Sequence, residues 1–170
     1  GSVRAGRAGA DYKPRKKKKR SEEAQAKQAK AIFEKVKSLA GDWVGTKGPY
    51  KGELTLSVRV IAGGSAVVER EFPGSPQEMI SVYHFDGNKV MLNHYCMLGN
   101  QPRLRVRMGD EKDTLLFKFV SATNHASKDD AHMHEGKLEF IDKDNIRSTW
   151  VMFENNKAKE EHSFEMTRKK

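Results

Sequence analysis

Residues 53–60 read Glu-Leu-Thr-Leu-Ser-Val-Arg-Val, an eight-residue run in which polar and apolar side chains alternate without a break. Successive side chains of a β-strand point to opposite faces, so this period of two predicts a strand with one buried and one solvated face. The same alternation recurs at residues 103–108 and at residues 115–119. Repeated short strands of this kind decide the fold class.

Turn-forming residues separate the predicted strands at short intervals, and no second helical pattern interrupts them. The turn signals are Gly63-Gly64, Pro73-Gly74, Asp86-Gly87-Asn88, Gly99-Asn100, Gly109-Asp110, Asp142–Asn145 and Asn155-Asn156. Consecutive strands without crossover helices form antiparallel meanders, and closure into a barrel removes the exposed edges of such a sheet. The sequence therefore predicts an all-β, antiparallel up-and-down β-barrel of about ten strands over residues 42–170.

A helix is predicted just before the barrel, over residues 21–40. Ser21 followed by two glutamates is a favourable start, and residues 24–39 are rich in the helix formers Ala, Lys and Gln. Gly41 is a typical residue at which a helix ends. The apolar residues fall on one narrow stripe that we expect to dock onto the barrel, namely Ala29, Ile32, Phe33, Val36 and Leu39.

The net charge of +9 belongs entirely to the N-terminal segment. Residues 1–41 hold 13 Lys and Arg against 4 Asp and Glu, whereas the remaining residues hold 19 of each sign. Six consecutive cations, Arg15–Arg20, repel one another, so residues 1–20 are predicted to be a disordered basic tail. The tail has two interpretations: an anchor for nucleic acid or another anionic surface, or a solvated tail without a partner.

Composition excludes several classes of protein. A chain of 170 residues fits one domain with an appendage, and no apolar run approaches the ~20 residues that a membrane-spanning helix needs. Cys96 is the only cysteine, which excludes an internal disulfide framework. Gly1-Ser2 has the form of a cloning remnant, so export after removal of a signal peptide stays open, as does the oligomeric state.

Two residues at the ends of the predicted barrel carry a family resemblance. Gly41-Asp42-Trp43 resembles the Gly-x-Trp opening of the calycin superfamily, which includes lipocalins and fatty-acid-binding proteins. Arg168 occupies the place where those barrels put an arginine across the tryptophan. The resemblance implies a structural role for both residues, because a guanidinium can stack on the indole while it bonds nearby carbonyl groups.

Residues 39–168 are also similar to a group of uncharacterised bacterial proteins with lipocalin-like barrels. The similar strings are Tyr83–Gly87, His94–Cys96, Gly99–Arg103, His132–His134 and Ser148–Trp150. This resemblance implies a lipocalin-like barrel, and it brings no established activity and no ligand.

Several polar residues are predicted to face the barrel interior. His94 and Cys96 share a strand face with apolar residues, and by the same alternation His132, His134 and Gly136 share another. We therefore expect a non-enzymatic binding protein that holds a small, largely apolar ligand in the barrel. The candidate ligand-binding residues are Tyr83, His94, Cys96, Gln101, His132, His134 and Trp150.

The histidines support an alternative in which the interior holds a metal ion or heme. His132-x-His134 puts two imidazoles on one side of a strand, at a spacing that suits chelation of one ion. The candidate metal ligands are His94, His134 and His162, with Cys96 as a further donor. His162 corresponds by position to the heme-binding histidine of nitrobindin-like barrels. The opposing interpretation is that interior histidines bond one another, tyrosines and water.

No catalytic residue is predicted. Cys96 with His94 as a base has no glycine-rich oxyanion turn or orienting acid at a suitable spacing. The acidic residues are expected mostly in turns or on outward faces, so no pair of carboxylates is predicted to do acid–base chemistry. Phosphate-binding glycine loops are absent from the sequence pattern.

Overall fold

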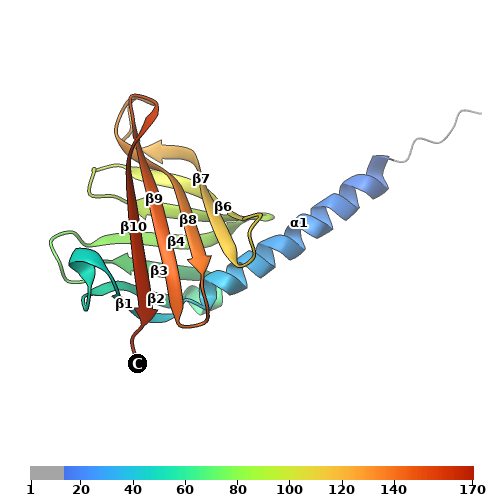
Figure 1. The fold of residues 1–170 in the computed structure, drawn as a ribbon. Coiled ribbons are helices and arrows are strands. Elements are labelled where there is room, and N and C mark those ends of the chain that lie inside the picture. The colour runs from blue at the N-terminus through green and yellow to red at the C-terminus, as the bar shows by residue number, and fades with distance from the viewer. Residues whose placement is uncertain (1–13) are drawn as a thin grey trace, which may run out of the picture.

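A computed structural model of the protein describes residues 14–170 and contains a closed ten-stranded antiparallel β-barrel with one N-terminal α-helix (Figure 1). This confirms the fold class predicted from the sequence. The strands are β1 Gly41–Gly45, β2 Leu54–Ile61, β3 Ala66–Glu71, β4 Met79–Asp86, β5 Lys89–Tyr95, β6 Gln101–Met108, β7 Thr114–Thr123, β8 His132–Phe140, β9 Asn145–Glu154 and β10 Lys157–Arg168. Each strand pairs with its neighbour in sequence, and β1 pairs with β10 to close the barrel.

The helix α1, Pro14–Lys37, begins earlier than predicted. Its start at Pro14 replaces the predicted start at Ser21, so residues 14–20 of the expected disordered tail are helical, and residues 1–13 lie outside the described part. Lys and Arg are good helix formers, and proline is well suited to the first turn of a helix. No helix within residues 14–170 combines the length and apolar character that crossing a bilayer requires.

The second half of α1 closes one end of the barrel. Its predicted apolar stripe is buried and belongs to the same core as the barrel interior. The Phe33 ring lies 4.5 Å from the Phe85 ring between centroids, and Lys35 Nζ lies 2.8 Å from Asp113 Oδ1. These contacts join α1 to the β4–β5 turn and to the turn between β6 and β7. The loops β3–β4, β5–β6 and β9–β10 therefore lie at the opposite end.

Trp43 and Arg168 form the predicted pair at the closed end. The two residues are register partners of β1 and β10, and the guanidinium carbon lies 4.4 Å from the centroid of the Trp43 ring. Arg168 also donates hydrogen bonds to the carbonyl oxygens of Ser38 and Ala40, just after α1. Trp43 Nε1 donates to the Leu39 carbonyl oxygen at 2.8 Å. One stacked pair thus ties the helix, the first strand and the last strand together.

Candidate functional site

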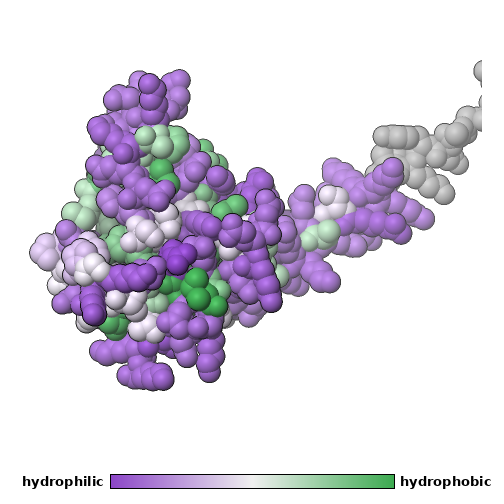
Figure 2. All heavy atoms as spheres, viewed as in Figure 1, coloured by the Kyte–Doolittle hydropathy of each residue, from purple (hydrophilic) through white to green (hydrophobic). Residues whose placement is uncertain are grey.

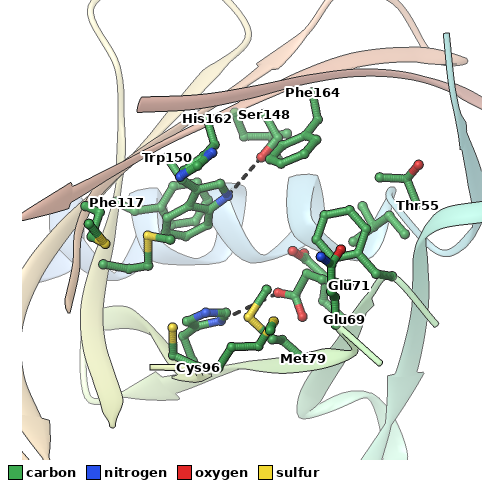
Figure 3. Close-up of a pocket in the computed structure, with 18 of the residues that line it drawn as sticks. Thr55, Glu69, Glu71, Met79, Cys96, Phe117, Ser148, Trp150, His162 and Phe164 are labelled. Atoms are coloured by element: carbon green, nitrogen blue, oxygen red, sulfur yellow. Dashed lines mark hydrogen bonds and ion pairs between the residues drawn. The ribbon is translucent and has the colours of Figure 1, made fainter. Parts of the chain in front are cut away.

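The barrel interior contains a cavity of about 290 Å³. It lies toward the end away from α1, because Tyr50, Phe72, Met97 and Leu98 from the loops of that end are among its lining residues. Figure 3 shows the cavity with residues of β2, β3, β4, β9 and β10 around it. The apolar lining residues are Leu39, Tyr50, Leu56, Phe72, Met79, Tyr83, Met97, Leu98, Phe117, Met133, Leu138, Trp150, Met152, Phe164 and Met166.

Trp150 forms much of one wall of the cavity. Its ring stacks on Phe117 at 5.2 Å between centroids and lies 6.0 Å from the His94 ring, nearly parallel to both. Its Nε1 donates to Ser148 Oγ at 3.0 Å. A Cβ atom at Gly136 on β8 would stand 2.9 Å from atoms of both the Trp150 and Phe117 rings. The absence of a side chain at Gly136 therefore makes room for the stacked rings.

Replacing Gly136 with alanine is expected to lower the free energy of unfolding by about 1–3 kcal/mol, because the new methyl group overlaps two packed rings. Urea unfolding measures the change. The double variant Gly136→Ala/Trp150→Leu should recover part of the loss, since leucine leaves space that the indole fills. Purely additive losses in the two variants would contradict the proposed contact.

Two carboxyl groups from β3 face the interior of the barrel. Glu69 is 7% exposed, and both Glu69 and Glu71 line the cavity on the same strand face as the buried Val67. Glu69 and Glu71 are therefore exceptions to the expectation that acidic residues lie mostly in turns or on outward faces. The signal was present in the sequence, because the alternation that buries Val67 also turns residues 69 and 71 inward.

These carboxyl groups belong to a hydrogen-bonded network across β3, β4 and β5. The Tyr83 hydroxyl donates to Glu69 Oε2 at 2.9 Å. Ser81 Oγ donates to Glu71 Oε1 at 2.5 Å and lies 2.8 Å from His94 Nδ1. With Ser81 donating to Glu71, His94 in its Nδ1–H tautomer supplies the donor for Ser81 Oγ. The protonation of Glu71 and the tautomer of His94 are thus linked through one hydroxyl group.

Burial shifts the pKa of every titratable member of this network toward its neutral form. Burial raises the pKa of Glu69 from 4.5 to about 7, against the hydrogen bond from Tyr83. The pKa of Glu71 lies well above its usual value because of burial and the nearby Glu69. Burial lowers the pKa of His94 to about 4 and raises the pKa of Tyr83 well above 10. At neutral pH His94 is therefore an uncharged ring beside a pair of acids that hold protons unusually strongly.

Four of the seven predicted ligand-binding residues line the cavity, namely Tyr83, His94, Cys96 and Trp150. The Cys96 thiol has a raised pKa, chiefly because of burial, and so lacks the thiolate character of a nucleophile. Gln101 is not among the lining residues. Its Oε1 accepts from Thr123 Oγ1 and its Nε2 donates to the Gly99 carbonyl oxygen, so it holds the ends of neighbouring strands together.

His132 and His134 do not line the cavity, in contrast to the prediction. The pairing of β8 with β9 contains a β-bulge between Met133 and Glu135, which changes the alternation of side chains along β8. As a result Met133 lines the cavity and His132 bonds His134 at 2.9 Å and His125 at 3.1 Å. The His134 ring stacks between two phenylalanine rings, those of Phe119 and Phe153.

The candidate metal ligands are not brought together. His94 and His162 line the cavity, and His134 lies in the separate histidine cluster. Within residues 14–170 no group of three or more His, Cys, Asp or Glu side chains is placed to hold a metal ion. His162 Nε2 lies 3.2 Å from Glu160 Oε2 on the same strand, and its side chain is 45% exposed.

The basic run lies on the half of α1 that projects away from the barrel (Figure 1). Residues 16–20 are exposed, and Figure 2 shows mostly hydrophilic side chains along this projecting part. Residues 16–20 are therefore not part of the cavity lining. That they bind an anionic partner stays a prediction.

The chain matches no protein-family model, and no curated protein is significantly similar to it.

Proposed function

We propose that the protein is a non-enzymatic binding protein that takes one small, largely apolar ligand into the barrel cavity, and that it is a lipocalin-like member of the calycin superfamily. The cavity supports the proposal that the protein binds a ligand. Its wall is mostly aromatic, aliphatic and methionine side chains, with a few polar groups among them. This combination is typical of small-molecule sites, where apolar surface supplies affinity and polar groups supply orientation.

The size of the cavity limits the ligand. A volume of about 290 Å³ lies at the lower end of the ~300–1,000 Å³ typical of ligand sites. It corresponds to roughly ten water molecules at about 30 Å³ each. A ligand with a short alkyl chain or one or two fused rings fits this space.

The methionines favour a ligand of adaptable fit. Met79, Met97, Met133, Met152 and Met166 all line the cavity. The unbranched methionine side chain has three rotatable bonds and a polarisable sulfur, so it repacks around different apolar shapes at low cost. The wall can therefore accommodate several related apolar molecules.

Titration with the neutral apolar fluorophore N-phenyl-1-naphthylamine tests the proposal. We expect fluorescence to rise with a stoichiometry of one and a dissociation constant in the micromolar range. In Met152→Trp the larger ring fills the cavity, and affinity is expected to fall at least about tenfold, the effect of losing ~1.4 kcal/mol of contact.

The matched control is Ile141→Trp, which adds the same ring at a residue 57% exposed in the β8–β9 turn, outside the cavity lining. Its affinity for the fluorophore should equal that of the natural sequence. If Met152→Trp unfolds, Met133→Phe is the substitute at the facing position of β8. Equal affinity in the filled and control variants, or no binding at all, would refute the proposal.

A further inference from the structure

We propose that the ligand of this cavity carries a positively charged amino group, which the Glu69 and Glu71 carboxyl groups bind while the aromatic wall takes its apolar part. This inference rests on the proposed function and specifies the chemical class of the ligand.

The charge of the lining selects for a cation. The cavity is lined by three acidic side chains, Glu69, Glu71 and Glu160, and by no lysine or arginine among the described residues. Residues 42–170, which form the barrel, hold 19 basic and 19 acidic side chains, so an excess of acids in the lining stands out. The basic members of the lining, His94 and His162, include one ring that burial keeps neutral. A ligand carboxylate or phosphate would find no lysine or arginine in the lining with which to pair.

The two acids have hydrogen-bonding capacity that the protein does not use. Glu71 Oε2 is buried and has no hydrogen-bond partner within residues 14–170. Glu69, although 7% exposed, receives the Tyr83 hydroxyl on Oε2 alone among the described residues. A carboxyl group buried with an unpaired oxygen costs stability, and a ligand that donates a hydrogen bond to that oxygen would remove the cost. An ammonium group has three donors, enough to reach both acids at once.

The aromatic rings are placed to cover the rest of such a ligand. β3, which carries the acids, and β9, which carries Trp150, lie on opposite sides of the ten-stranded ring. Figure 3 shows Glu69 and Glu71 on one side of the cavity, with Trp150 and Phe164 on the facing side. A cation within about 6 Å of an aromatic ring face gains further stabilisation. The apolar part of an amine then packs against the rings and methionines.

Binding of a cation is coupled to release of protons. The pKa of Glu69 is raised to about 7 and that of Glu71 is raised well above its usual value, so both carboxyl groups hold protons more strongly than exposed glutamates do. A cation favours the ionised carboxylates, so affinity should rise with pH. The titratable side chains that line the same cavity from the other elements are Tyr50 before β2, Tyr83 on β4, His94 on β5, Cys96 after β5, and Glu160 and His162 on β10.

Isothermal titration calorimetry with three eight-carbon compounds tests the inference: octylamine, octanol and octanoate. We expect octylamine to bind at one site at least about tenfold more tightly than octanol, and octanoate to bind most weakly, because charged hydrogen bonds are gained only by the amine. Between pH 6 and pH 8 the affinity for octylamine should rise, and its binding heat should depend on the buffer, as expected for proton release. The affinity for octanol should stay level.

The variant Glu69→Gln/Glu71→Gln keeps the shape of both side chains and removes their charge. We expect its ratio of octanol to octylamine dissociation constants to fall to about one, whereas Glu161→Gln, an exposed residue outside the cavity lining, keeps the natural ratio. Equal affinities for the three compounds, or tightest binding of octanoate, would overturn the amine inference and leave the proposed function standing. If neither these compounds nor N-phenyl-1-naphthylamine binds, both proposals fail.

Discussion

Replacing Trp43 with alanine is expected to lower the free energy of unfolding by about 3–5 kcal/mol, the cost of removing a large aromatic side chain from a packed core. Trp43 is 1% exposed and supports three elements at once. Its loss leaves a cavity beneath Arg168, removes the stacking surface for the guanidinium and leaves the Leu39 carbonyl oxygen without its indole donor. The end of α1 and the closure of β1 against β10 should both weaken.

Urea unfolding followed by circular dichroism measures this loss. Trp43→Phe keeps a ring under Arg168 but no N–H donor, so we expect a smaller loss than for alanine, and this variant gives a value even if Trp43→Ala does not fold. Trp150→Phe changes the same residue type in the cavity wall and should leave the junction of α1 with β1 intact. A loss below about 1 kcal/mol for Trp43→Ala would contradict the role given to this pair.

The second large effect is on the pH dependence of stability. Burial raises the pKa of Glu69 from 4.5 to about 7, so between these values the folded protein binds more protons than the unfolded chain. Stability contributed by the neutral form is therefore fully present below pH 4.5 and is lost as the pH rises through 7. Each pKa unit corresponds to about 1.4 kcal/mol, so the stability of Glu69→Gln relative to the natural sequence should increase by roughly 3 kcal/mol as the pH rises over this range.

The buried histidine gives the opposite slope over an overlapping pH range. Burial lowers the pKa of His94 from 6.5 to about 4. Between these pH values the histidine is protonated in the unfolded chain and neutral in the folded protein. His94 therefore makes stability fall as the pH drops from 6.5 toward 4, which offsets the gain that Glu69 gives over the overlapping range below pH 7.

Urea unfolding at pH values from 4 to 8.5 separates these contributions. The difference between Glu69→Gln and the natural sequence should rise with pH, because only the Glu69 carboxyl group is removed. Ser148→Ala alters the cavity wall without a titrating group, so its difference should stay level with pH. A level difference for Glu69→Gln as well would show that this carboxyl group is not buried as the structure has it.

The barrel could be predicted from the sequence because polar and apolar side chains alternate along several of its strands. Residues 53–60 and 103–108 alternate as written and form β2 and β6. The pairing of Trp43 with Arg168 is implied by the resemblance to calycin barrels, and the structure makes the two residues partners of β1 and β10. The early start of α1 could not be predicted, because along residues 15–20 like-charge repulsion opposes the helix propensity of Lys and Arg.

The polar side of the cavity was harder to predict than its apolar side. Glu69 and Glu71 face inward by the same alternation as Val67, but charged residues are rarely buried, which favoured an outward assignment. His132 and His134 were wrongly placed because one bulge in β8 changes the alternation, and its position depends on pairing with β9. Cavity volume also depends on how side chains from many strands pack, as at Gly136, where the rings of Phe117 and Trp150 meet.

The central claim is that the barrel interior admits a small molecule, and a crystal structure of the protein with N-phenyl-1-naphthylamine tests it most directly. The account predicts one fluorophore inside the barrel, between Trp150 on β9 and the carboxyl groups of β3, with the backbone of the ten strands unchanged. A fluorophore bound on the outer surface or along α1, with the interior closed by its own side chains, would contradict it.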